Sequence, residues 1–96
     1  MQIKFLAIAQ IELDDSIEYY NRQVRGLGRQ FLDEIIKALD LIAKYPEAWP
    51  QISERTRRCQ INRFPYGLIY QKRNNEILII AVSHLHRKPE YWQERI

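Results

Sequence analysis

The sequence predicts a single α+β domain in which a helical hairpin packs on one face of an antiparallel sheet. Apolar residues recur at steps of three and four as far as residue 44, which is typical of amphipathic helices. Beyond residue 56 they alternate with polar residues, which is typical of strands. The 96 residues are too few for two hydrophobic cores, so one domain spans residues 1–96. The predicted order is strand, helix, helix and three strands, followed by a short C-terminal helical turn.

The N-terminal half supplies one strand and both helices. Residues 3–6 are β-compatible and run into a helix over about residues 8–24. A second helix is expected over about residues 29–44, because glycines at positions 26 and 28 separate two helical patterns. Pro46 ends this helix, since it has no amide hydrogen to donate and it biases Tyr45 away from helical angles. The short link makes the two helices an antiparallel hairpin.

The C-terminal half predicts a meander of three strands. Residues 57–63, 66–72 and 76–85 have strand patterns, and residues 73–75 have the composition of a hairpin turn. The apolar run over residues 77–82 predicts burial on both faces, and therefore a central strand with a neighbour on each side. The N-terminal strand is the predicted second neighbour.

Cysteine content and the length of the apolar runs point to the cytoplasm. The single cysteine, Cys59, excludes an internal disulfide, and its alternating context favours a core position over a reactive thiol. The longest apolar run is far shorter than the roughly 20 residues that span a bilayer, and the N-terminus lacks the layout of a signal peptide. We therefore expect a cytoplasmic protein without a membrane partner.

The positive charge is concentrated in the second half of the chain. Residues 1–53 hold six Lys and Arg against eight Asp and Glu, whereas residues 54–96 hold nine against four. The first part therefore has a net charge of −2 and the second a net charge of +5. This asymmetry favours a polyanion or an acidic protein as the binding partner.

Five segments, in this order, resemble a known toxin pattern. They are Tyr19-Tyr20, Gly26-Leu27-Gly28 with Phe31-Leu32, the segment YPEAWP at 45–50, the segment RFPYGLIY at 63–70, and the segment HLHRKPEYW at 84–92. Together they extend over nearly the whole chain. On these segments the sequence resembles the RelE/ParE toxin family of type II toxin-antitoxin systems, in its ParE-like plasmid-stabilisation branch.

The resemblance implies a toxin that is neutralised by a cognate antitoxin and reaches operator DNA only through that antitoxin. It implies one of two activities: inhibition of DNA gyrase in the ParE-like branch, or ribosome-dependent mRNA cleavage in the RelE-like branch. RelE-like nucleases have an arginine where this chain has Gly67. We therefore favour a gyrase inhibitor that is not an enzyme and needs no cofactor. An endoribonuclease and a non-toxic regulatory relative are the alternatives.

RNA cleavage by a 2'-hydroxyl needs a base, cations for the phosphate and an acid for the leaving oxygen. If the chain is an endoribonuclease, the candidates for these roles are His84, Arg87, Tyr91 and Arg63, with His86 as a further histidine. Arg63 lies four residues before Gly67 and shares its strand parity. Arg63 can take the place of the missing arginine only if the break at Phe64-Pro65 does not shift the alternation of side chains along the strand.

The two histidines also have the spacing of paired zinc ligands. His84 and His86 are two residues apart, so in a strand they project from one face. Zinc sites in proteins take three or four protein ligands, and no third ligand is apparent in the sequence. We therefore predict no metal site.

Basic and aromatic residues supply the candidates for partner binding. Three interpretations of the basic residues remain: a solvated surface, a docking site for an acidic antitoxin segment, and a track for a phosphate backbone. The two tryptophans either cover the core or anchor a partner. The candidate residues for binding the antitoxin or the target are Arg57, Arg58, Trp49, Arg73, Lys88 and Trp92.

Overall fold

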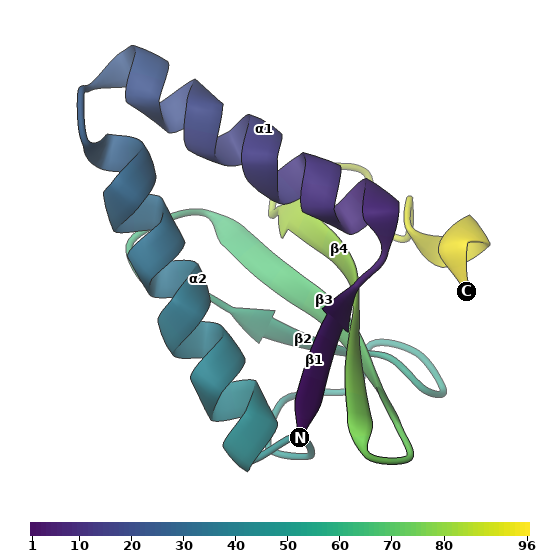
Figure 1. Cartoon of the computed structure of the whole chain (residues 1–96). Coiled ribbons are helices and arrows are strands. Elements are labelled where there is room, and N and C mark those ends of the chain that lie inside the picture. The colour runs from purple at the N-terminus through teal and green to yellow at the C-terminus, as the bar shows by residue number, and fades with distance from the viewer.

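The computed structural model describes residues 1–96 and has the predicted order of elements (Figure 1). A strand β1 is followed by two helices, three strands and a 3-10 turn. Their bounds are β1 Gln2–Phe5, α1 Ala7–Gln23, α2 Leu27–Lys44, β2 Arg57–Gln60, β3 Tyr66–Arg73, β4 Glu76–His84 and the turn Gln93–Arg95. The α+β class, the helical hairpin and the C-terminal helical turn are confirmed.

The hairpin between α1 and α2 depends on two glycines with different roles. Gly26 adopts a φ of 86°, a left-handed backbone conformation that residues with a Cβ rarely adopt. Gly28 is buried where the helices meet, and a Cβ there would lie 2.5 Å from the carbonyl oxygen of Ile17. The side-chain oxygen of Asn21 accepts a 2.8 Å hydrogen bond from the Gly28 amide. The link is therefore a tight packed corner.

The sheet has the order β1-β4-β3-β2, so β4 is central, as its apolar run predicts. The neighbour on one side is β3, and the neighbour on the other is the N-terminal strand, as expected. The predicted antiparallel sheet is confirmed for β2, β3 and β4, whereas β1 runs parallel to β4, with Ile3 opposite Ile77. β1 fills the edge of β4 that β3 leaves open, and it runs in the same direction as β4.

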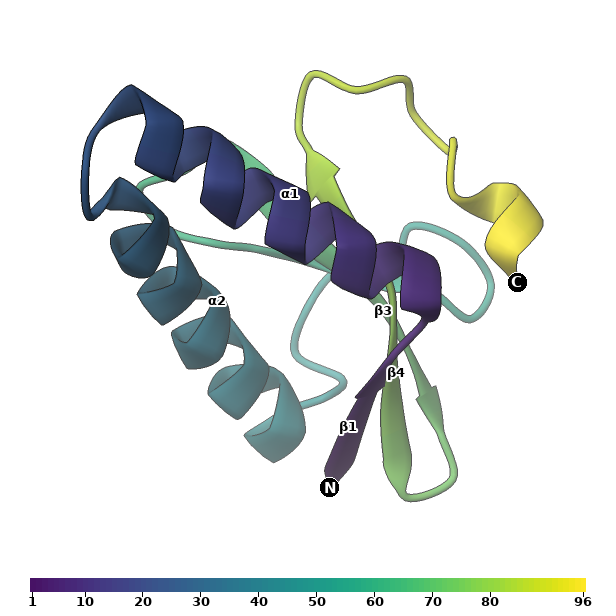
Figure 2. The same cartoon turned by 45° about the horizontal axis from the view of Figure 1, so that its top comes forward.

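Both faces of the sheet are covered, but by different parts of the chain. The helices bury the larger core, whose fully buried members include Phe31, Ile35 and Leu68. A smaller cluster on the other face contains Ile80 and Trp92. Figure 2 shows the segment after β4, residues 85–96, crossing to the start of α1; we call this segment the tail.

Candidate functional site

The most highly connected polar group in the protein is the carboxylate of Glu12, on α1. Arg95 of the tail donates to both of its oxygens, at 2.8 and 2.9 Å. The hydroxyl of Tyr91 donates at 2.9 Å, and the backbone amide of Val82 donates at 3.0 Å. The Arg95 and Glu12 side chains are only 14% and 11% exposed, so this ion pair is largely shielded from water. Glu12 thus fastens the tail to α1 and to β4.

The same ion pair occupies a place at the edge of β4 that a strand would otherwise fill. β1 pairs with β4 only as far as Ile79, and α1 begins directly afterwards. Beyond that point Glu12 accepts from the Val82 amide, and Arg95 donates to the Ile80 carbonyl at 3.0 Å. Two side chains therefore continue the hydrogen-bonding ladder of the sheet edge.

Two of the candidate residues for RNA cleavage belong to this Glu12 cluster. The Arg87 guanidinium stacks 3.9 Å from the centre of the Tyr91 ring and lies 3.6 Å from a Glu12 oxygen. Burial is the largest of the effects that raise the pKa of Tyr91 above its usual value. The hydrogen bonds that Arg95 donates to Glu12 raise the pKa of Arg95. Tyr91 is therefore a protonated donor to Glu12 at neutral pH.

The histidines lie at the end of β4 and form a pair of their own. The His84 and His86 rings are 5.1 Å apart, and His84 Nδ1 accepts a 3.0 Å hydrogen bond from the His86 amide. The other neighbour of His84 is the Tyr66 ring, at 5.0 Å. No group of three His, Cys, Asp or Glu side chains in the protein is arranged to hold a metal ion.

Arg63 lies in a separate place from the other three candidates. Its φ of 71° ends the strand pattern, so β2 stops at Gln60. Arg63 therefore lies outside the strands, so the condition under which it could replace the missing arginine, an unchanged strand phase up to Gly67, is not met. Its guanidinium donates to Gln30 at 2.6 Å and lies 3.8 Å from Glu34, both on α2.

A different arginine lies over Gly67. A Cβ at position 67 would lie 3.1 Å from Cγ and 3.2 Å from Cδ of Arg58, on the neighbouring strand β2. Arg58 also lines a cavity of about 210 Å³ beside the tail. The other polar or basic residues around this cavity include Ser83, His84, Arg87 and Lys88. Five of the predicted site residues therefore line this one cavity: Arg58, His84, Arg87, Lys88 and Trp92.

Two other predicted binding residues have structural partners within the protein. Arg57 donates to the backbone carbonyls of Trp49, at 2.6 Å, and Glu47, at 3.2 Å. It thereby holds the loop after α2, together with Tyr70, whose hydroxyl donates to the Pro46 carbonyl at 2.7 Å. Trp49 packs against the larger core and is half-buried.

Trp92 is buried in the smaller core, with 4% of its surface exposed. It therefore covers the core, which is one of the two roles that the sequence left open. A partner reaches this side chain only if the tail moves.

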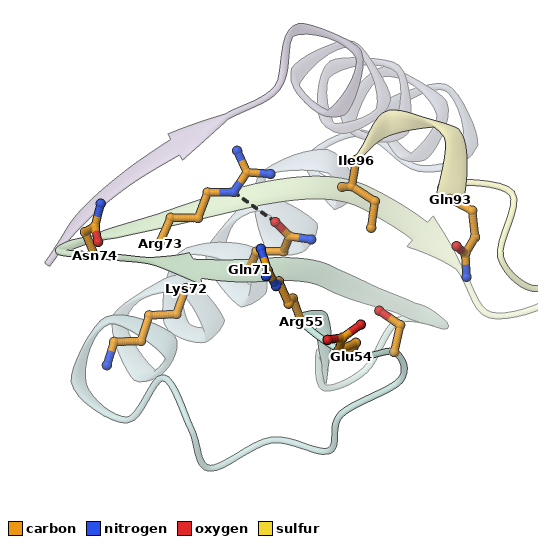
Figure 3. Close-up of a pocket in the computed structure, with 9 residues that line it drawn as sticks. Glu54, Arg55, Gln71, Lys72, Arg73, Asn74, Gln93 and Ile96 are labelled. Carbon is orange, nitrogen blue, oxygen red and sulfur yellow. Dashed lines mark hydrogen bonds between the residues drawn. The ribbon is translucent and has the colours of Figure 1, made fainter.

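Arg73 lines a groove of about 780 Å³ at the far end of the same sheet face (Figure 3). We call it the hairpin groove, because it lies beside the β3–β4 turn. Its lining residues come from the loop before β2, the β3–β4 hairpin and the 3-10 turn: Ser53, Glu54, Arg55, Gln71, Lys72, Arg73, Asn74, Gln93 and Ile96.

Sequence reasoning missed Glu12 and Arg95, which organise the tail. They are 83 residues apart, and nothing in the local pattern around either residue indicates a partner. One signal was present: Glu12 is adjacent to Leu13, which faces inward on α1, so its carboxylate lies at the boundary between the buried and the exposed face of the helix. A carboxylate at such a boundary position needs a donor from another element.

Comparison with known proteins agrees with the resemblance found in the sequence. The family model described as "ParE toxin of type II toxin-antitoxin system, parDE" matches residues 3–89. A solved structure titled "Chromosomal ParDE TA system from P. aeruginosa" is 17% identical in sequence. The similarity covers 90% of this chain and 97% of that chain, with a TM-score of 0.76, so the two share a fold. The search of curated proteins found no match.

Neither α1 nor α2 contains an apolar stretch that could span a bilayer. The family match extends over most of the chain, from β1 to the start of the tail. The chain therefore belongs to the ParE toxin family of type II toxin-antitoxin systems.

Proposed function

We propose that this protein arrests bacterial growth in the cytoplasm by binding DNA gyrase, and that a cognate antitoxin neutralises it by direct contact. The observation that carries this proposal is the ParE family match over residues 3–89. Gyrase inhibition is the activity implied by the ParE-like branch. The complex with the antitoxin then binds operator DNA through the antitoxin alone.

The arrangement of the candidate cleavage residues supports a non-catalytic mode of action. A general acid or base must be free to exchange a proton with the substrate. The Tyr91 hydroxyl already donates to Glu12, and burial raises its pKa. Arg63 is held on α2, away from the tail. Tyr91 and Arg87 contact Glu12, and His84 pairs with His86. The four candidates therefore lie in three separate groups, each with partners inside the protein.

Exposed apolar residues on the helical hairpin support a protein partner. Five large apolar side chains on the two helices are 41–55% exposed, in addition to the apolar residues that each helix buries. Exposed apolar patches on small soluble proteins commonly mark interaction sites. These residues are Ile8, Ile11 and Tyr19 on α1, and Ile36 and Leu41 on α2. They are candidates for contact with the antitoxin or with gyrase.

A ribosome-dependent mRNA endoribonuclease is the second candidate, and one observation favours it. Arg58 lies over Gly67, so a guanidinium-bearing side chain reaches the position where RelE-like nucleases carry an arginine. The adjacent cavity also contains His84 and Arg87. These residues include a base and cations of the kind that phosphodiester cleavage needs.

The two candidates are separated by assays on purified protein and in cells. A gyrase inhibitor blocks supercoiling without ribosomes and leaves a gyrase-independent topoisomerase unaffected; in cells it lowers thymidine incorporation before methionine incorporation. An endoribonuclease lowers methionine incorporation first and cleaves transcripts on ribosomes, and the double variant His84→Ala, Arg87→Ala abolishes that cleavage. This second pattern would overturn the gyrase proposal. Normal growth after strong induction, with antitoxin binding retained, would instead indicate a non-toxic relative.

A further inference from the structure

The hairpin groove contains an arginine whose orientation is fixed from inside the protein. Gln71 is 5% exposed, and its amide nitrogen donates to the hydroxyl of the fully buried Thr56 at 3.2 Å. This bond directs the Gln71 carbonyl oxygen to Arg73, whose Nε donates to it at 2.9 Å. The Gln71 side chain thus donates through its amide nitrogen and accepts through its carbonyl oxygen. Figure 3 shows the resulting arrangement, with the rest of the Arg73 guanidinium pointing away from Gln71.

A second arginine lines the same groove from the opposite side. Arg55 lies in a loop that closes on itself, because the Thr56 carbonyl accepts from the amides of Ile52 and Ser53, at 2.8 and 3.3 Å. The loop and β3 are therefore held together by Thr56, through its backbone and its side chain.

Neither arginine has an anionic partner within the protein. No carboxylate oxygen lies within 4.0 Å of Arg55 or Arg73, although Glu54 also lines the groove. Lys72 points to the other side of β3, where its amine lies 3.5 Å from Glu47. Two unpaired guanidinium groups therefore face one polar cavity, and one of them is held by a buried amide.

We propose that the hairpin groove binds an extended acidic peptide segment, with a carboxylate held between Arg73 and Arg55. Arginine presents a planar fork of donors that matches a carboxylate, and the bond from Gln71 leaves the two Nη groups free for it. Asn74, Gln93 and Ser53 supply side-chain donors and acceptors that suit a peptide backbone.

The composition of the groove favours a peptide over a nucleic acid. Single-stranded nucleic acids are bound by cationic grooves with aromatic side chains on which bases stack. The nine lining residues include no aromatic one, and the single apolar one is Ile96. The groove thus fits a ligand with carboxylates and backbone amides but without bases.

This inference deepens the proposed function, and rests on it in one respect: an antitoxin is the partner expected to supply such a segment. The interaction itself is independent of toxicity. A titration with purified protein therefore tests the groove even if the protein proves not to inhibit gyrase.

The experiment measures binding of three labelled probes by fluorescence anisotropy at low ionic strength. The probes are a short glutamate-rich peptide, a matched peptide with glutamine in place of every glutamate, and a single-stranded oligonucleotide of similar net charge. Each is titrated with the unaltered protein and with Arg73→Gln, Arg73→Lys and Arg25→Gln. The last variant, Arg25→Gln, removes another exposed arginine without a salt bridge, in the α1–α2 link, far from the groove.

We expect the glutamate peptide to bind at least about tenfold more tightly than the glutamine peptide, because a charge-assisted bidentate pair is lost in the latter. Arg73→Gln should bind the glutamate peptide about tenfold more weakly than the unaltered protein does. Arg73→Lys should show most of this loss of affinity, since lysine keeps the charge but lacks the planar fork of donors. Arg25→Gln should bind as the unaltered protein does.

Three outcomes would overturn the inference. The first is equal binding of the two peptides. The second is an equal loss in Arg73→Gln and Arg25→Gln, which would mean diffuse attraction by net charge. The third is an Arg73-dependent preference for the oligonucleotide, which would make the groove a phosphate site. Thermal melting of each variant confirms that a loss of binding is not a loss of folding.

Discussion

Replacing Glu12 by glutamine removes one charge at the point where the tail, α1 and β4 meet. The substitution keeps the size of the side chain but turns one acceptor oxygen into a donor. That amide nitrogen would face donors, because Arg95, Tyr91 and the Val82 amide all point to this group. The Arg95 guanidinium, 14% exposed, would then lack an anionic partner. We therefore expect Glu12→Gln to weaken docking of the tail.

The size of the effect follows from the burial of the pair. Removing one partner of a buried ion pair costs about 3–5 kcal/mol, because it leaves the other charge uncompensated. Glu12 and Arg95 retain a little exposure, so we take the lower end, about 3 kcal/mol. A domain of this length has a total stability of about 5–14 kcal/mol. The variant should therefore fold, with a melting temperature lowered by about 12–24 °C.

Detachment of the tail sets an upper limit to this cost. If the tail leaves the sheet before the rest of the protein unfolds, Trp92 becomes exposed while the helices persist. Urea unfolding should be followed by far-ultraviolet circular dichroism and by tryptophan fluorescence in a Trp49→Phe background, where Trp92 is the only reporter. Hydrogen exchange of the Val82 amide is a third readout, because Glu12 is its acceptor.

Glu18→Gln is the matched control. Glu18 lies on the same helix and pairs with Arg22, but the two side chains are 60% and 74% exposed. An exposed pair of this kind contributes about 0.3–0.5 kcal/mol. Equal losses of stability in Glu12→Gln and Glu18→Gln, with unchanged exchange at Val82, would refute the reasoning.

Four further predictions concern stability and reactivity. Burial raises the pKa of Cys59 to about 11 and that of Tyr70 to about 12, so the folded state favours the protonated forms. The stability that these two groups contribute is fully present at pH values below their pKa in the unfolded chain. It should be lost as the pH rises from about 9 to 12, which urea unfolding across that range measures. Cys59 should resist iodoacetamide at pH 8 until the protein is unfolded; rapid alkylation of the folded protein would contradict its burial. Gly28→Ala should lower the free energy of unfolding by about 3 kcal/mol, because the new Cβ would meet the backbone of α1. Gly26→Ala should lower it by about 1 kcal/mol, because only the left-handed backbone conformation opposes it. Equal melting temperatures of the two variants would refute this difference. Arg57→Gln should lower stability by about 2 kcal/mol and expose Trp49 to acrylamide quenching, since its two bonds to carbonyls hold that loop; unchanged quenching would mean that the loop is held by other contacts.

The helices and the central strand could be predicted because their patterns are local. Apolar positions on α2 repeat with a helical period, and the run over residues 77–82 has no polar interruption. The predicted bounds agree to within two residues for both helices and for the last two strands. The first strand of the meander was predicted too long, because Arg63 takes a left-handed conformation that the alternation of its neighbours does not reveal.

The direction of β1 and the contacts of the tail could not be predicted in the same way. A four-residue strand shows the same alternation in a parallel and in an antiparallel pair. The bonds from Arg95 and Tyr91 to Glu12 join residues about 80 positions apart, and such pairs leave no periodic signal. Arg58 and Arg57 are adjacent basic residues in the sequence, yet one faces a cavity and the other holds a loop.

The family could be recognised although the site could not be assembled. The segments that carry the resemblance are glycine, proline and aromatic positions, which determine turns and core packing. Most of the candidate site residues are arginine and lysine side chains, whose neighbours depend on how distant parts of the chain fold together. The ParE family is therefore confirmed, and the individual binding residues stay predictions.

The ladder formed by Glu12 and Arg95 also bears on self-association. Unpaired strand edges recruit strands from other molecules, and natural proteins block them with charges or with covering segments. The segment Ile77–Val82 is uncharged, rich in β-branched residues and free of proline, which is the composition of segments that form amyloid. β1 and β3 protect most of it, and the ion pair closes the remaining open edge at Ile80 and Val82. Glu12 and Arg95 therefore cover the last unpaired stretch of this strand, and we expect their loss to promote association at that edge.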